Sequence, residues 1–180
     1  INVTQDGMID LDHALDVLAG LADEQRPTTL LSVMAANNET GVIQPLAELA
    51  ALAHEYGIAM HSDMVQLLGK DHFSFAALGL DYASLSAHKI GGSAGVGALL
   101  VKPGNALTSL LRGGGQEQGR RSGTENLIGI AGFGAAASAA FGDVVHYVVM
   151  SKWRDQFENM VLENVPDACV FGQQAPRLGN

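Results

Sequence analysis

The apolar residues of this chain follow two different spacings in turn. Residues 11–21 (LDHALDVLAGL) and 45–57 (PLAELAALAHEYG) repeat them at helical intervals, and the second stretch begins with Pro and ends with Gly. Four short continuous apolar runs lie between and after these stretches, at 29–37, 58–66, 82–88 and 95–101. Such runs are typical of strands buried on both faces of a sheet. The alternation predicts an α/β fold with a mainly parallel central sheet.

The last third of the chain has a different pattern. A glycine-rich stretch at 112–126 precedes a run of small residues at 127–140, which predicts a helix packed closely against other backbone. A second, more charged helix is predicted over 143–163. We therefore assign residues 1–142 to one large domain, and residues 143–180 to a connecting helix and the start of an incomplete second domain.

Composition narrows the possible partners. The chain has 180 residues, a hydrophobic content of 47% and a formal charge of −9, with only ten Lys and Arg. It can bury a substantial core, but its cations form no stripe that would neutralise phosphates, which argues against nucleic acid and anionic membranes. We expect a small-molecule ligand.

Features of the ends and of the cysteine content bear on location. The chain begins at Ile1 without a signal-like pattern, and its longest apolar stretches are interrupted by Gly, Asn or charge. We expect a soluble, cytoplasmic protein, and the missing initial Met suggests a piece of a longer one. Cys169 is the only cysteine, so an internal disulfide framework is excluded. We expect Cys169 to be a small buried hydrophobe rather than a nucleophile.

Polar side chains gather where the predicted strands end. They are Asn38, Asp63, Gln66, Ser86, His88 and Lys89. The carboxyl ends of parallel strands meet at one edge of a sheet, where ligands of α/β proteins bind. So many polar groups need partners there. A ligand with an anionic group, a basic ring nitrogen and a carbonyl would satisfy them together.

Each of these residues also has a simpler interpretation. Asp63 could cap a helix or a turn, and Lys89 could be a solvated strand end. His61, His72 and His88 with Asp63 could suggest a metal site. The sequence has no His-x-x-x-His pair and no cysteine cluster, which weighs against a metal.

Four ordered stretches together resemble one known family. They read ANNETGVIQP, HSDMVQLLGK, SAHKIGGSAGVGALLV and GGGQEQGRRSGTEN, and the resemblance covers residues 29–141. The family is that of the pyridoxal-phosphate-dependent cysteine desulfurases, in the class V aminotransferase group. The resemblance implies the three-layer large domain of fold type I enzymes and the cofactor pyridoxal 5'-phosphate.

The resemblance also implies roles for two polar residues and an apolar neighbour. Lys89 matches the lysine that binds the cofactor covalently, a reaction that needs a neutral amine and is favoured at a partly desolvated strand end. Asp63 matches the carboxylate that pairs with the pyridine nitrogen. Val65, two positions on and hence on the same strand face, would pack beneath the ring.

The remaining carried-over residues would bind the polar groups of the cofactor. Gln66 and Asn38 match donors to the phenolic oxygen of the ring, and Asn38 would also lie near the substrate. Ser86 and His88 match phosphate ligands. Thr124 matches a residue that reaches the phosphate of the other subunit, so the resemblance implies a homodimer.

The implied reaction converts L-cysteine to L-alanine and leaves the sulfur as an enzyme persulfide. A sulfur acceptor or iron–sulfur scaffold protein would receive it, for iron–sulfur cluster assembly or tRNA thiolation. The family's sulfur-accepting cysteine follows the RSGT segment at a distance that this chain does not reach, and Cys169 matches no family motif. The cofactor-stacking histidine and further phosphate contacts upstream are also missing, so we expect little turnover from this chain alone.

Two other interpretations stay open from the sequence. A selenocysteine lyase or another class V aminotransferase would share Lys89, Asp63 and Gln66, and a non-catalytic structural fragment is also compatible with the chain. Two departures from the family pattern are Met64 and the GSAG stretch at 92–95. Met64 alternates with its neighbours on the predicted strand, so we expect its side chain to point away from the ring.

Overall fold

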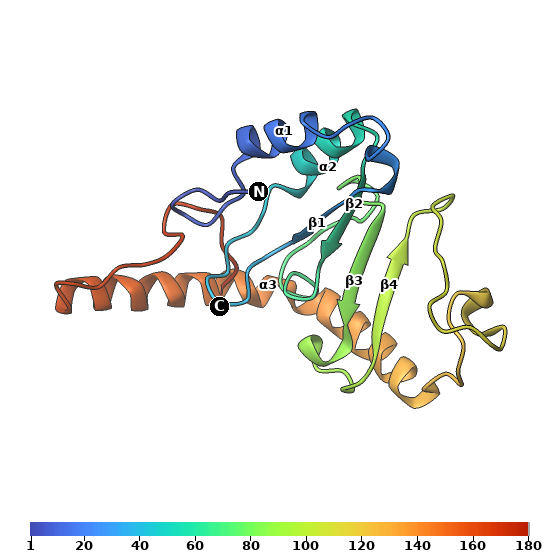
Figure 1. The fold of residues 1–180 in the computed structure, drawn as a ribbon. Helices are drawn as coiled ribbons and strands as arrows, with labels where there is room; N and C mark the ends of the chain where they lie inside the picture. Colours follow the sequence, from blue (N-terminus) through green and yellow to red (C-terminus); the bar gives the residue numbers. More distant parts are fainter. Residues whose placement is uncertain (180) are drawn as a thin grey trace.

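One four-stranded sheet organises the chain. The computed structural model describes residues 1–179 and orders the strands β1-β2-β3-β4 (Figure 1). Strands β1 (Leu30–Met34), β2 (Ala59–Asp63) and β3 (Tyr82–Ser86) are parallel, and β4 (Gly97–Val101) runs antiparallel to β3. The predicted α/β fold with a mainly parallel sheet is confirmed.

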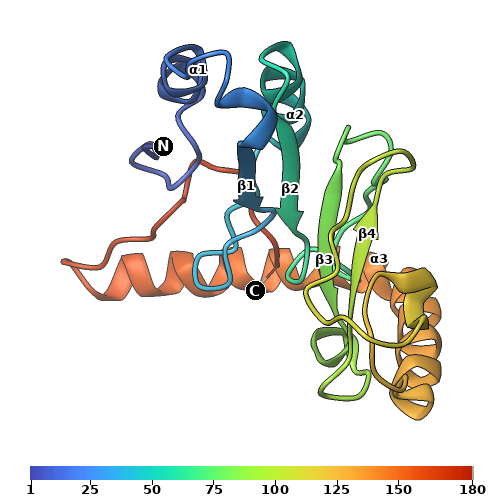
Figure 2. The same cartoon turned by 45° about the vertical axis from the view of Figure 1, so that its right-hand side comes forward.

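Two helices pack at the upper end of the sheet in both views (Figures 1 and 2). Helix α1 (Leu11–Ala19) begins after Asp10, whose carboxylate accepts a hydrogen bond from the His13 amide. Helix α2 (Leu46–Glu55) follows Pro45 and packs on β2, while α1 packs on α2. Both helices lie within their predicted ranges.

The core lies between α2 and one face of the sheet. In β1, Leu31 and Val33 are buried while Leu30 and Ser32 are exposed. In β2 the fully buried residues likewise alternate with half-buried ones. Because successive side chains of a strand point to opposite faces, the two strands bury one face against α2.

Three one-turn 3-10 helices occupy the connections: η1 (Arg26–Thr28), η2 (Ala87–Ile90) and η3 (Gln116–Gly119). Helix η2 takes up residues that the sequence pattern assigned to a strand over 82–88. The chain leaves η2 through Gly91 at φ 82°, a backbone conformation that favours glycine. The end of β3 is therefore a sharp turn.

The last helix, α3 (Leu127–Asn164), is continuous over 38 residues. The prediction of two separate helices at 127–140 and 143–163 is wrong, because no proline interrupts the segment and a single Gly142 does not break a helix. The helix crosses position 142, where we placed a domain boundary; that boundary stays a prediction. Both views show α3 passing the carboxyl ends of β1–β3 (Figures 1 and 2).

Part of α3 is also apolar enough to cross a membrane by length and composition alone. The segment Leu127–Tyr147 has a mean hydropathy of 1.5 and is 11% buried, and it is the one such helix within residues 1–179. The expectation that every apolar stretch is interrupted too early is wrong for this segment. Within it, Ala140 and Val144 are buried against the rest of the chain.

The tail after α3 returns to the loop that follows β1. The Ile43 amide donates to the Pro176 carbonyl at 2.8 Å, and the Leu178 amide donates to the Gly41 carbonyl at 2.9 Å. Cys169, in the irregular part of this tail, is exposed. The expectation of a buried Cys169 is therefore wrong, because it lies where the chain has left the helix and packs on nothing that would cover it.

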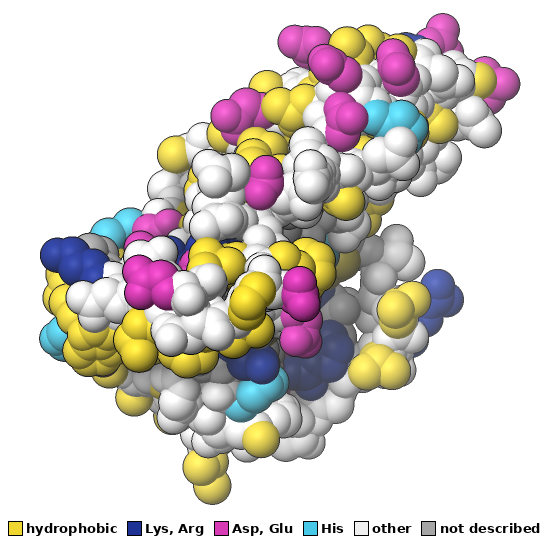
Figure 3. Space-filling model, turned by 90° about the vertical axis from the view of Figure 1, so that its left-hand side faces the viewer, with side chains coloured by type: hydrophobic (Ala, Val, Ile, Leu, Met, Phe, Trp, Pro, Cys, Tyr) yellow, Lys and Arg dark blue, Asp and Glu magenta, His cyan; other side chains and the backbone are white. Residues whose placement is uncertain are grey.

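Charge is unevenly distributed over the surface. Figure 3 shows acidic side chains gathered on the upper part of one face, at the height of α1 and α2 in Figure 1, with Lys and Arg lower down. The acidic surface therefore lies away from the carboxyl ends of β1–β3.

Candidate active site

The carboxyl ends of β1, β2 and β3 lie side by side, as the parallel pairing requires. After β1, the Asn37 side chain accepts hydrogen bonds from the amides of Glu39 and Thr40 at 2.8 and 2.9 Å. Asn37 thereby shapes the turn and leaves Asn38 exposed, with its amide donating to Glu39 Oε1 at 2.7 Å. Of the two neighbouring asparagines, Asn38 is the one that is exposed to solvent at this edge.

Asp63 is the last residue of β2. Its Oδ1 accepts a hydrogen bond from the Val65 amide at 2.9 Å, which fixes the carboxylate at the strand end. Val65 lies in the turn after β2 and not in the strand, so placing it by strand alternation was wrong. Val65 is half-buried like Asp63, whereas Met64 is fully buried in the hydrophobic core. Met64 thus belongs to the core, and its orientation away from the ring stays a prediction.

The turn after β3 holds the SAHK motif. Ser86 Oγ and His88 Nδ1 lie 2.8 Å apart and share a hydrogen bond. Ala87 is the buried residue of η2, and this turns His88 and Lys89 outward. The expectation that Lys89 ends a buried strand is therefore wrong: it is exposed on η2.

Gln66 lies in the turn after β2 and is 6% exposed. Its Oε1 accepts a hydrogen bond from Lys70 Nζ at 2.7 Å. Burial lowers the pKa of Lys70, and the nearby positive charge of Lys89 lowers it further. Lys70 therefore belongs to the same cluster as Gln66 and Lys89, although the sequence interpretation did not single it out.

Thr124 lies apart from the other candidates. It is exposed in the segment before α3, and Figures 1 and 2 show this segment beyond β4, at the opposite side of the sheet from β1. The chain does not bring Thr124 together with Asp63 and Lys89.

A polar row also lies across the strands near Asp63, and the sequence interpretation had considered its His61 only as a metal ligand. His61 bridges two strands, with Nδ1 2.8 Å from Ser32 Oγ and Nε2 3.1 Å from Ser84 Oγ. Burial lowers the pKa of His61, and the Asp63 carboxylate opposes part of this shift. The signal was present in the sequence, because Ser32, His61 and Ser84 each occupy a strand position. In residues 1–179, no group of three or more His, Cys, Asp or Glu could hold a metal ion.

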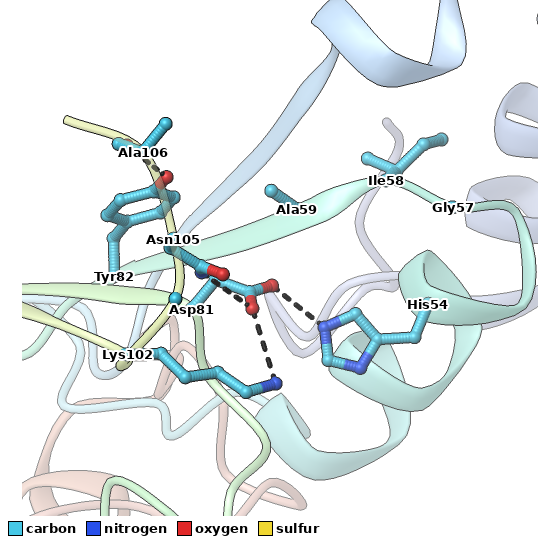
Figure 4. A pocket seen from close by; sticks show the side chains of 10 residues that line it. His54, Gly57, Ile58, Ala59, Asp81, Tyr82, Lys102, Asn105 and Ala106 are labelled. Carbon is cyan, nitrogen blue, oxygen red and sulfur yellow. Dashed lines mark hydrogen bonds and ion pairs between the residues drawn. The ribbon is translucent and has the colours of Figure 1, made fainter. Parts of the chain in front are cut away.

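A hollow of about 470 Å³ lies at the amino edge of the parallel strands (Figure 4). In its wall, the buried Asp81 carboxylate accepts hydrogen bonds from the Met60 amide at 2.9 Å and from Asn105 Nδ2 at 2.9 Å. His54 Nε2 lies 2.8 Å and Lys102 Nζ 3.4 Å from the same carboxylate. This hollow is at the opposite edge from Lys89, so it is separate from the candidate site.

The polar side chains at the carboxyl edge suit one kind of ligand. They comprise an exposed amine, a carboxylate, a buried amide and a hydroxyl–imidazole pair, carried by Lys89, Asp63, Gln66, Ser86 and His88. A small anionic heteroaromatic molecule with a carbonyl group could be held by all of them. Pyridoxal phosphate has each of these groups, so the residues present fit it.

The fold and this edge define an α/β protein with a candidate ligand site at the carboxyl ends of its strands. Residues 1–176 match the family described as aminotransferase class-V. The chain belongs to this family, whose members depend on pyridoxal phosphate.

Individual relatives agree with this assignment. The chain is 40% identical over 180 residues to a cysteine desulfurase of Enterobacter agglomerans and 42% identical over 170 residues to one of Klebsiella pneumoniae. These alignments cover 100% and 94% of this chain. An X-ray structure of a NifS-like protein from Rickettsia africae superposes over 100% of this chain, with a TM-score of 0.90 and 36% identity.

The matches extend over less than half of those proteins. The chain spans 43% of both curated relatives and 49% of the Rickettsia chain. The matched region includes α3, so the long apolar helix is part of the shared fold.

Proposed function

We propose that this chain is the cofactor-binding part of a pyridoxal-phosphate-dependent cysteine desulfurase. The observation that carries the proposal is the juxtaposition, at neighbouring strand ends, of Asp63, the Ser86–His88 pair and Lys89. The curated relatives named as cysteine desulfurases support the same activity.

The residues of this chain would divide the work by chemistry. Lys89 would bind the cofactor covalently through its amine, and Asp63 would accept a hydrogen bond from the protonated ring nitrogen and keep it protonated. Ser86 and His88 would donate to the phosphate, since they lie together at the open end of β3. When bound, the cofactor supplies an electron sink that weakens the bonds at the substrate Cα.

The side chains near the ring would orient the cofactor. Val65 would pack beneath the ring, and Gln66 would donate to its phenolic oxygen. Asn38, exposed at the end of β1, could donate both to the cofactor and to the substrate.

The proposed substrate is L-cysteine, the products are L-alanine and a persulfide on a cysteine of the enzyme, and the sulfur passes to an acceptor or iron–sulfur scaffold protein. We also propose a cytoplasmic homodimer, in which Thr124 reaches the phosphate bound by the partner subunit. The segment that carries Thr124 lies beyond β4, away from the carboxyl ends of β1 and β2, which supports this part of the proposal (Figures 1 and 2).

An absorbance measurement tests the cofactor site. Full-length protein with added pyridoxal phosphate should show a band at about 400–430 nm, and Lys89→Ala should abolish it because the amine proposed to form the covalent link is removed. The matched control is Lys152→Ala, which removes an exposed lysine on α3. Absence of the band in the unaltered protein at saturating cofactor, or its persistence in Lys89→Ala, would refute the assignment.

Product analysis tests the activity. With a thiol reductant added to release the persulfide sulfur as sulfide, L-cysteine should yield alanine and sulfide in equal amounts, and Lys89→Ala should reduce the rate by about a hundredfold or more, since covalent and acid–base roles are lost together. Cys169→Ser should leave the rate unchanged. A rate that collapses in Cys169→Ser would assign the sulfur-accepting role to that exposed thiol instead.

A further inference from the structure

A tight turn follows β2 and brings Lys70 back over Gln66. The amides of Leu67 and Leu68 both donate to the Met64 carbonyl at 3.0 Å, and the Lys70 amide donates to the Leu67 carbonyl at 3.0 Å. Lys70 Nζ then reaches Gln66 Oε1 at 2.7 Å. The two side chains are therefore held together by the backbone of a single turn.

The chemistry of this contact decides which way the amide faces. An ammonium group has only donors, so it must face the oxygen of the amide and not its NH2 group. The NH2 group of Gln66 is consequently turned away from Lys70. In the hydrogen bonds of residues 1–179, this NH2 group has no protein acceptor, although Gln66 is only 6% exposed.

Packing fixes the turn beside the lysine that would bind the cofactor. A Cβ on Gly69 would lie 2.9 Å from Ala140 Cβ and 3.0 Å from Ile90 Cγ2, so the turn is pressed against both α3 and η2. Gly69 also has a φ of 76°, which few other residues adopt. Lys70 is near enough to Lys89 for the two positive charges to interact.

We propose that Lys70 is a positioning residue, which holds the oxygen of Gln66 so that its NH2 group is presented to the phenolic oxygen of the cofactor. The inference rests on the proposed function, because it requires the cofactor to occupy this edge. It predicts that Lys70, which the family resemblance did not assign to the cofactor, controls the hydrogen bonding of Gln66, which the resemblance did assign.

Cofactor binding in the full-length protein tests the role. Lys70→Met keeps most of the unbranched side chain and removes its donors, and we expect about tenfold weaker binding of pyridoxal phosphate, the effect of losing one oriented hydrogen bond. The pH midpoint of the 400–430 nm band should rise by about one unit, because the phenolic oxygen loses a donor. Lys70→Arg should retain most of the cofactor affinity and most of the original pH midpoint, since arginine also offers only donors.

A double-mutant cycle separates orientation from the loss of charge. In Gln66→Leu, adding Lys70→Met should cause no further change in affinity or midpoint, because there is no amide left to orient. Lys152→Met is the control for removing a lysine elsewhere, and it should behave like the unaltered protein. Circular dichroism of each variant checks that it folds.

The outcomes distinguish this inference from the proposed function. If the unaltered protein shows the band, Lys89→Ala abolishes it, and Lys70→Met binds cofactor normally, the positioning role is refuted and the proposed function stands. Additive effects of Lys70→Met and Gln66→Leu would also refute it, since Lys70 would then act independently of Gln66. If the unaltered protein shows no band, the proposed function itself fails.

Discussion

Asp81 joins three separate parts of the chain through one buried carboxylate. The side chain is 8% exposed and meets His54 from α2, the Met60 amide from β2 and Asn105 from the loop after β4. Burial by itself would raise the pKa of Asp81. The hydrogen bonds from Asn105, the Met60 amide and His54 outweigh burial and lower the pKa to about 2.

The lowered pKa makes the stability of the protein depend on acid. A carboxyl group whose pKa is about 2 when folded and 3.8 when free stabilises the fold above pH 3.8, and this contribution is lost as the pH falls toward 2. The shift corresponds to about 2 kcal/mol. Urea unfolding should therefore show a lower free energy of unfolding at pH 3 than at pH 6. This decrease should be smaller in Asp81→Asn, which has no carboxylate to protonate at position 81.

The same substitution should be costly at neutral pH. Asp81→Asn places an NH2 group where donors converge, and we expect a loss of about 2–3 kcal/mol in the free energy of unfolding. Asp23→Asn, which alters an exposed ion pair with Arg26 at 2.8 Å, is the matched control and should have a much smaller effect. Equal losses in the two variants would show that burial of Asp81 does not determine its contribution.

Single residues differ in how far sequence could place them. Asn38, Asp63 and Ser86 could be assigned to one edge because parallel strands align their carboxyl ends. Asp81 could not be singled out, since its partners are 21 to 27 positions away and come from elements whose packing is not written in their spacing. The Lys70–Gln66 contact depends equally on the turn geometry.

At the scale of elements, the tail after α3 is held by a paired ion bridge. Arg177 donates to both carboxylate oxygens of Glu158 at 2.7 Å, and the Arg177 side chain is 7% exposed. The hydrogen bond to Glu158 raises the pKa of Arg177. The bridge joins the tail to α3 directly beside the Gly41–Ile43 loop.

Replacing one partner of the Arg177–Glu158 bridge should lower the free energy of unfolding more than replacing both partners. Arg177→Met leaves the carboxylate of Glu158 without its main partner, and we expect a loss of about 3 kcal/mol, whereas Arg177→Met with Glu158→Leu should recover part of it. Chemical denaturation of the three proteins gives the comparison. A double variant that is less stable than Arg177→Met would contradict the expectation.

Boundaries of elements were predicted less well than their types. The helices at α1 and α2 and the four strands were all expected from apolar spacing, which reflects burial of one face. The turn at η2 was assigned to a strand because its residues continue the apolar run, and only the packing of Ala87 shows that the chain bends there. Likewise, the continuity of α3 depends on the absence of a local breaker rather than on apolar spacing.

For the whole molecule, a large apolar surface along α3 is exposed to solvent. Along α3, Phe141, Val145, Trp153, Phe157 and Met160 are each more than 60% exposed and recur at short intervals. Soluble proteins rarely leave such a patch open to water. The chain spans 43% of its curated relatives, which is consistent with further protein covering this helix in the full assembly.

Trp153 reports on that cover, because it is the only tryptophan and is 64% exposed here. In the full-length protein we expect its fluorescence emission to be blue-shifted relative to the urea-denatured protein and to resist quenching by acrylamide. The reason is that covering the helix removes water from the indole ring. Denaturation in urea should restore quenching and serves as the control. Efficient quenching in the native full-length protein would show that the helix stays open.

The β3–β4 hairpin has Asp81 at one end and the Ser86–Lys89 turn at the other. Its two strands pair over their whole length, from Tyr82 with Val101 to Ser86 with Gly97. A hairpin that is anchored at one end opens as a cooperative unit rather than fraying residue by residue. Hydrogen exchange at Leu85 and Ala98 should then accelerate when Asp81 is neutralised, so that a carboxylate at the far edge of the sheet would set how long Lys89 stays aligned.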